Sequence, residues 1–154
     1  MFRILLLLSL LLGSTLTYAQ QVVSFAKADE AGLRTTALDS LYRSAVHTDT
    51  LQAVFQDQQA FIDAYTRMLQ DLGDHLQRNG FEWPGPVRGF NRIYFAADGS
   101  VDHFLYSIRP GQISTEQEAR FEEFLRGFVS GYHLPMKAEV PFAQCSPVTF
   151  MPKE

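Results

Sequence analysis

The longest apolar pattern in the chain has the period of a helix. Apolar side chains recur at steps of three and four residues: Phe61, Tyr65, Met68, Leu72 and Leu76. Residues at this spacing share one face of an α-helix, so the pattern predicts an amphipathic helix over about residues 50–78. A break in it would fall near Asp57. Asn79 and Gly80 follow, and glycine commonly ends a helix in the left-handed conformation.

A second helix is predicted from Ser114 to Ser130. Its apolar stripe consists of aromatic and leucine side chains: Phe121, Phe124, Leu125, Phe128 and Tyr132. Ser114 with Gln117, or Thr115 with Glu118, has the spacing of a capping box, in which two residues satisfy each other's free backbone N–H groups. A shorter helix is predicted across residues 37–46, where apolar residues also gather on one side.

Between these helices, two aromatic-rich runs flank Asp98-Gly99, which is a strong signal for a β-hairpin. A two-residue loop would pair Phe95 with Asp102. A three-residue loop would pair Phe95 with Val101 and Ile93 with His103, with Gly99 in the left-handed position of a bulge. We favour the second register, because the first places an acid opposite a core aromatic residue.

In the favoured register, one face of the hairpin carries Ile93, Phe95, Val101 and Leu105, interrupted by His103. The other face is mixed but aromatic, with Phe90, Arg92, Tyr94, Asp102, Phe104 and Tyr106. It is either partly covered by another helix or a binding surface. The candidate binding residues are the aromatic side chains expected to be exposed: Trp83, Tyr94, Phe104 and Tyr106. Trp83 lies in a loop rich in proline and glycine, where it is either a recognition anchor or a plug over the end of the core.

The order of these elements predicts an α+β fold, a small antiparallel sheet with helices packed on one face as a two-layer sandwich. Residues 134–140 and 146–151 are expected to be short strands, with Pro147 at an edge or a strand start. Residues 20–35 lack periodicity and are expected to form a flexible, frayed segment before a single domain over residues 36–154.

The region from about Phe90 to Phe150 resembles the C-terminal domain of TonB-type proteins. The matching features are Asp98-Gly99-Ser100-Val101, the helix after Ser114, Val140-Pro141-Phe142 and Val148-Thr149-Phe150. The chain lacks the proline-rich spacer and the Tyr-Pro start of that family. The resemblance therefore implies a small envelope domain that binds by adding a strand to a partner, rather than an energy transducer. Otherwise the chain looks like an exported bacterial protein, a likeness that carries no activity with it.

The first residues have the features of a secretory signal peptide. Arg3 supplies a positive charge, residues 4–12 are almost entirely apolar, and Thr17-Tyr18-Ala19 offers small residues at a cleavage site. We expect a signal peptide over residues 1–19, cleavage after Ala19, and no membrane-spanning segment in the remaining chain. The protein is then periplasmic or secreted.

Charge and side-chain chemistry narrow the function classes. The net charge is −4 and the basic residues are not clustered, which argues against nucleic-acid binding. No His, Cys or carboxylate group has the spacing of a known metal site, and nothing around the single cysteine, Cys145, resembles a catalytic nucleophile. We expect no cofactor and no catalysis. The main hypothesis is an exported interaction module for an envelope protein or peptide, and the alternative is a small-ligand-binding protein or hydrolase with its site between helix and sheet.

Overall fold

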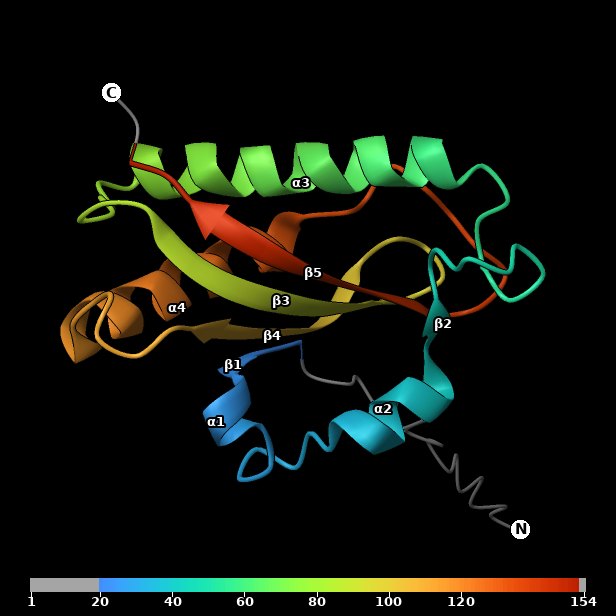
Figure 1. Ribbon diagram of the computed structural model, residues 1–154, viewed down its shortest axis with the longest axis horizontal. Helices are drawn as coiled ribbons and strands as arrows, with labels where there is room; N and C mark the ends of the chain where they lie inside the picture. Colours follow the sequence, from blue (N-terminus) through green and yellow to red (C-terminus); the bar gives the residue numbers. More distant parts are fainter. Residues whose placement is uncertain (1–19, 153–154) are drawn as a thin grey trace, which may run out of the picture.

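The computed structural model describes residues 20–152 of the chain, so the predicted signal peptide lies outside the described residues. Within this range, five strands form one sheet in the order β1-β4-β3-β5-β2 (Figure 1). The strands are β1 (Gln21–Ser24), β2 (Arg43–Ser44), β3 (Val87–Phe95), β4 (Val101–Ile108) and β5 (Phe142–Phe150).

The strands of this sheet pair in both directions. β3 lies in the middle and runs antiparallel to β4 and β5, whereas β1 runs parallel to β4 and β2 runs parallel to β5. The predicted α+β class is confirmed, but the prediction of a small antiparallel sheet is wrong. The two parallel strands, β1 and β2, are short and pair with residues far away in the chain, so no local sequence pattern predicts them.

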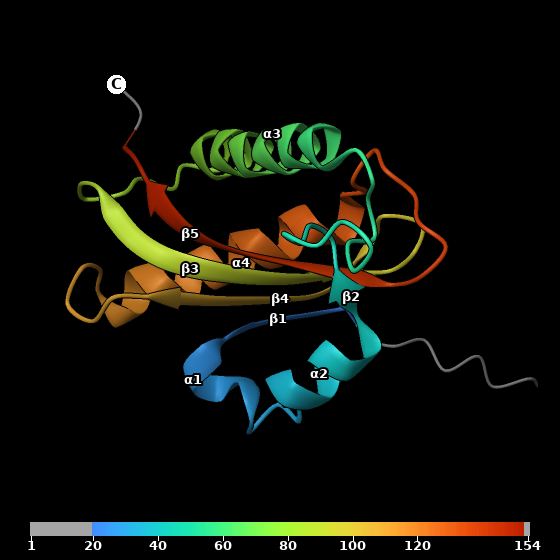
Figure 2. The same cartoon turned by 45° about the vertical axis from the view of Figure 1, so that its right-hand side comes forward.

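Helices cover both faces of the sheet, as the two views in Figures 1 and 2 show. α3 (Gln58–Arg78) and α4 (Thr115–Gly131) pack on one face, and α1 (Phe25–Ala28) and α2 (Thr35–Leu41) pack on the other. The predicted two-layer sandwich with helices on one face is therefore wrong, because the sheet is the middle of three layers. Both faces of the β3–β4 hairpin are apolar, and each needs a cover.

Residues 20–35, predicted as a frayed segment, instead form β1, α1 and the turn that leads to α2. Val22 packs in the core under α3 and α4, and Val23 packs in the smaller core under α1 and α2. The Gln20 side-chain amide donates hydrogen bonds to the carbonyls of Val101 and Val129, at 2.6 and 2.8 Å. A strand of four residues is too short to show a periodic pattern.

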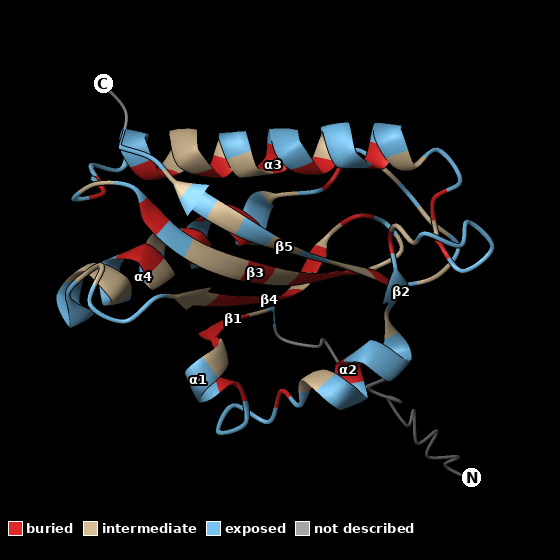
Figure 3. Ribbon diagram, in the orientation of Figure 1, coloured by how far each residue is buried: buried red, intermediate tan, exposed pale blue. Residues whose placement is uncertain are grey.

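The second long helix begins at its predicted capping box, whereas the first begins at Gln58 rather than near residue 50. Asp57 caps α3 by accepting a hydrogen bond from the Ala60 N–H group at 3.0 Å, so this helix begins after the expected break. Ser114 and Gln117 form the reciprocal capping box of α4. In Figure 3 the buried side of α3 faces the sheet and the exposed side faces away, as its apolar stripe predicts.

The hairpin register is as predicted next to the turn and differs from the prediction beyond Asp102. Phe95 pairs with Val101, but a bulge follows, and Tyr94 rather than Ile93 lies opposite His103. Asp102 is the extra residue of this bulge. The residues of β4 beyond Asp102 therefore reach the opposite face from the one predicted, as one extra residue does in any strand. Phe104 and Tyr106 join the core under α3 and α4, whereas Leu105 joins the core under α1 and α2.

Gly99 has the predicted left-handed conformation, with φ of +90°. A Cβ atom on Gly99 would lie 2.4 Å from the carbonyl oxygen of Leu134 and 2.8 Å from that of Met136. The Leu134 N–H group donates to the Gly99 carbonyl at 2.9 Å. The hairpin turn therefore holds the segment that leads from α4 to β5, and only glycine fits at this contact.

The last strand is longer and more continuous than predicted. β5 pairs with β3 without a break from Phe142 to Phe150, and residues 134–140 are not part of the sheet. Pro147 lies inside the strand, opposite Phe90, and does not end it. A proline is tolerated there because β5 is near the edge of the sheet and the missing N–H group faces away from β3.

Candidate functional site

The longest unpaired edge of the described sheet belongs to β5. On its outer side, β2 pairs only with Phe142 and Ala143, so within residues 20–152 no strand accompanies β5 from Gln144 to Phe150. An unaccompanied edge presents free N–H and C=O groups that another extended chain can pair with.

Two hydrogen bonds from β2 and the residue after it show which residues of β5 direct their backbone groups away from β3. Arg43 and Ala45 donate to the carbonyls of Pro141 and Ala143, at 3.1 and 2.9 Å. Backbone groups alternate along a strand, so the next outward positions are Cys145, Pro147 and Thr149. The edge therefore offers N–H groups at Cys145 and Thr149 only.

Two local features limit pairing at this edge. Pro147 has no N–H group, and the Gln144 side-chain amide donates to the Cys145 carbonyl at 3.0 Å. Natural proteins blunt exposed edges in this way to avoid unwanted association. The remaining edge can still pair with a strand, but it offers that strand only some of the backbone hydrogen bonds of a complete β-ladder.

A groove of about 530 Å³ runs between α3 and the end of β5. Thr66, Arg67, Leu69, Gln70, Gly73 and Asp74 form its helical wall, and Thr149, Phe150 and Met151 line the opposite side, with Trp83 at one end. Met151 is 59% exposed, which is unusual for a side chain of its size and polarity. The Tyr65 hydroxyl lies 2.7 Å from the Ser146 hydroxyl and links α3 to β5.

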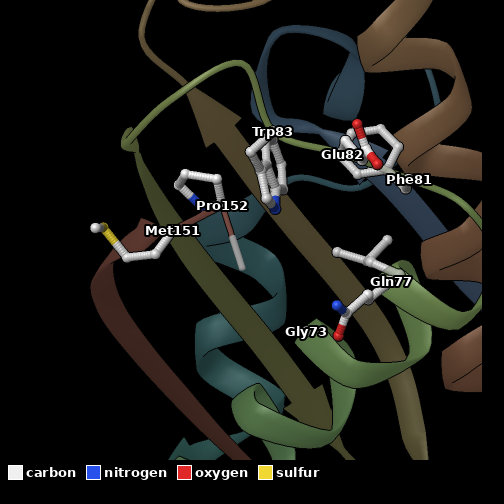
Figure 4. Close-up of a pocket in the computed structure, with 8 residues that line it drawn as sticks. Gly73, Gln77, Phe81, Glu82, Trp83, Met151 and Pro152 are labelled. Carbon is white, nitrogen blue, oxygen red and sulfur yellow. The ribbon is translucent and has the colours of Figure 1, made fainter. Parts of the chain in front are cut away.

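A second hollow of about 240 Å³ continues the groove past the end of α3. It is lined by Gly73, Leu76, Gln77, Phe81, Glu82, Trp83, Met151 and Pro152 (Figure 4). In that view the indole ring of Trp83 lies between Pro152 and Phe81, and the nitrogen end of the ring points toward the space beside Gly73 and Gln77. Gly73, Trp83 and Met151 line both hollows, so the two form one continuous groove.

The sequence left open whether Trp83 is a recognition anchor or a plug over the end of the core. Its side chain is 8% exposed and stacks on Phe150 with ring centroids 4.6 Å apart and planes 14° apart. It also contacts Phe81 and Phe121, at 4.8 and 5.2 Å between centroids. Trp83 therefore closes the end of the core, and its edge faces the groove.

The other predicted binding residues are not at the surface. Tyr94, Phe104 and Tyr106 are all 0% exposed, so the exposure expected of them is wrong. The reason is that helices cover both faces of the hairpin. The Tyr94 hydroxyl donates to Asp39 at 3.0 Å and the Tyr106 hydroxyl to Glu122 at 2.8 Å. Burial raises the pKa of both hydroxyls, and both stay protonated as donors.

A separate polar cluster lies beneath α2. Arg92 forms an ion pair with Asp39 at 2.5 Å, and the Tyr42 hydroxyl donates to Asp102 at 2.9 Å. His103 lies against the rings of Tyr42 and Tyr94, at 6.2 and 6.1 Å between centroids. Burial lowers the pKa of His103. These contacts attach α2 to the sheet.

Neither a hydrogen-bonded cysteine–histidine pair nor a metal-binding cluster is found among residues 20–152. Cys145 is exposed on β5 and has no histidine as a hydrogen-bond partner there. In the same range no group of three or more His, Cys, Asp or Glu side chains is placed to hold a metal ion. The space between the sheet and the helices α3 and α4 is filled by fully buried side chains: Phe61, Met68, Leu72, Phe95, Phe104 and Phe121.

Gly73 of the groove was not among the binding residues predicted from the sequence. It interrupts an otherwise regular helical pattern without a turn nearby, and that interruption was the signal that could have pointed to it. The free edge of β5 gave no signal, because which strand lies at an edge depends on the pairing of distant segments.

Residues 20–152 contain no helix that is long and apolar enough to cross a membrane.

Comparisons with known proteins do not place the chain in a family. No protein-family model matches it, and neither the curated proteins nor the solved structures contain a match.

Proposed function

We propose that this protein is a non-catalytic interaction domain that binds an extended segment of an envelope protein or peptide. The segment adds to the sheet as a strand beside β5 and places alternate side chains in the groove under α3. The observation that carries this proposal is the unaccompanied edge from Gln144 to Phe150 next to that groove. Recognition by strand addition uses main-chain hydrogen bonds for affinity and adjacent pockets for specificity.

Two further observations support the proposal. The resemblance of residues 90–150 to the C-terminal domain of TonB-type proteins implies a domain that binds by adding a strand to a partner. The signal peptide expected from the sequence implies a periplasmic or secreted protein, and such a segment of an envelope protein would be met there.

The test uses a pair of variants at one edge position. Thr149→Pro removes an outward N–H group and keeps the inward ladder to β3, whereas Thr149→Ala keeps the N–H group and removes only the side chain. The wild-type chain and both variants serve as bait in a solubilised envelope extract, and captured proteins are identified by mass spectrometry.

The proposal predicts a saturable partner that the wild type and Thr149→Ala retain and that Thr149→Pro loses. One lost main-chain hydrogen bond and the steric conflict of the ring together weaken binding about tenfold or more. If every partner is captured equally by Thr149→Pro, strand addition at this edge is wrong.

A further inference from the structure

Gly73 is not explained by the fold. It lies inside α3, where glycine costs stability relative to alanine, and its backbone does not have the positive φ that favours glycine. A Cβ atom at this position would meet no atom of the described chain within 4 Å. The missing side chain therefore leaves open space where the two hollows of the groove join.

Trp83 faces the same space with an indole N–H group that has no hydrogen-bond partner among residues 20–152. Most of its ring is buried, but the indole nitrogen is not among the buried unpartnered polar atoms of these residues, so it reaches the solvent in the hollow. The nitrogen end of the ring points into the hollow (Figure 4), so an occupant of the hollow can accept this hydrogen bond in place of water.

Among the described residues that line this hollow, the charged one is acidic. Glu82 lines it and has no ion-pair partner among the described residues, and Asp74 lies on the adjoining wall. The one basic residue of the groove, Arg67, lies two helical turns before Asp74, about 10 Å along the helix axis. Apolar groups of Leu76 and Met151 line the rest. A side chain with an apolar stem and a positive end fits this combination.

We propose that the hollow between Gly73 and Trp83 is the anchor subsite of the groove and takes an arginine or lysine side chain of the bound strand. This inference rests on the proposed function. The stem of the anchor residue lies across Gly73, its charged end meets Glu82, and a main-chain carbonyl of the same strand accepts the Trp83 indole N–H hydrogen bond.

The chain has a single tryptophan, so the indole N–H group of Trp83 gives one signal that can be followed directly. The experiment titrates ¹⁵N-labelled protein with end-blocked peptides of alternating valine and threonine that carry arginine, alanine or glutamate at the central position. It records the indole resonance of Trp83 and the amide resonance of Thr149 by NMR.

The expected result is that the arginine peptide shifts both resonances and binds at least about fivefold tighter than the alanine peptide. The glutamate peptide should bind weakest. Glu82→Gln should remove most of the preference for arginine. Gly73→Ala should weaken the arginine peptide about tenfold, because the added methyl group occupies the space of its stem.

Gly127→Ala is the matched control. Gly127 also lies inside a helix, and a Cβ atom there would make ordinary contact with His75 at 3.7 Å, away from the groove. This variant should bind the arginine peptide as the wild type does.

The outcomes separate this inference from the proposed function. If Thr149 responds and Trp83 does not, or if the glutamate peptide binds as tightly as the arginine peptide, the anchor subsite is wrong and strand addition stands. If neither resonance responds to any peptide, both proposals fail.

Discussion

β1 and the outer part of β5 are both edge segments of one sheet, but they are built differently. β1 has four residues, and its side chains are buried on both faces, under α3 and α4 on one side and under α1 and α2 on the other. β5 has nine residues, and its outward positions Cys145, Pro147 and Thr149 are exposed. A short edge with two buried faces contributes to the core, whereas a long edge with one open face remains available for contact.

The largest expected effect tests whether β1 is a structural edge. Val22→Asp buries an unpaired carboxylate in the main core and should destabilise the protein by about 3–5 kcal/mol. The matched change on the other edge, Thr149→Asp, places the same group at an exposed position and should change stability by about 0.5 kcal/mol or less. Urea denaturation measures both. Equal losses would contradict the distinction between the two edges.

The next largest effect tests whether the turn at Gly99 holds β5 in place. Gly99→Val forces a β-branched residue into positive φ and against the Leu134 carbonyl, so it should destabilise the protein by about 3 kcal/mol. Because residues 134–138 connect the hairpin turn to β5, amide exchange should also rise along β5. A melting temperature equal to that of the wild type would mean that the turn does not hold this segment.

Acid should weaken the β1 side of the sheet. The pKa of His103 is lowered from its usual 6.5 because the folded state buries the ring, although the nearby Asp102 carboxylate opposes this shift. The unfolded chain therefore takes up a proton at higher pH than the folded chain does. Stability should decline as pH falls through the unfolded pKa of about 6.5, and the decline should end only below the lower pKa of the folded state.

The rings of Tyr42 and Tyr94 and the carboxylate of Asp102 face His103. His103→Gln should flatten the decline, whereas His133→Gln, at an exposed position, should leave it unchanged. Thermal unfolding followed over this pH range measures both. A decline of the same size in His103→Gln would assign it to other groups.

The smallest effect concerns the groove beside β5. Gly73→Ala and Gly127→Ala each replace a helical glycine by the best helix former, and each should stabilise the protein by about 1 kcal/mol, or raise its melting temperature by about 3 °C. Calorimetry measures the shift. A loss of stability in Gly73→Ala would show that the fold itself needs glycine at this position.

Local patterns predicted the parts of the fold that local interactions determine. The apolar stripe of α3, the capping box at Ser114 and the left-handed Gly99 all follow from residues close in sequence. The pairing of Phe95 with Val101 follows from the turn, but the bulge at Asp102 does not, because it depends on packing against both helical layers.

The remaining errors have two physical causes. Phe104 and Tyr106 were expected to be exposed because the bulge at Asp102, which turns them toward α3 and α4, was not expected. Tyr94 was expected to be exposed because α1 and α2 were not expected to cover the sheet. That cover depends on β1, whose pairing with β4 joins segments about 80 residues apart, at Gln21 and His103. Of the predicted binding residues, only Trp83 borders the groove, because it comes from a loop at the end of the core rather than from the hairpin.

Amide hydrogen exchange with and without the arginine peptide tests the central claim most directly. If the peptide adds as a strand to β5, the amides of Cys145 and Thr149 become protected on binding, because these are the outward N–H groups of the free edge. The amides of Val22, Val23 and Ser24 in β1 keep their exchange rates. Unchanged exchange at Cys145 and Thr149, or protection that appears on β1 instead, would contradict the assignment of β5 as the binding edge.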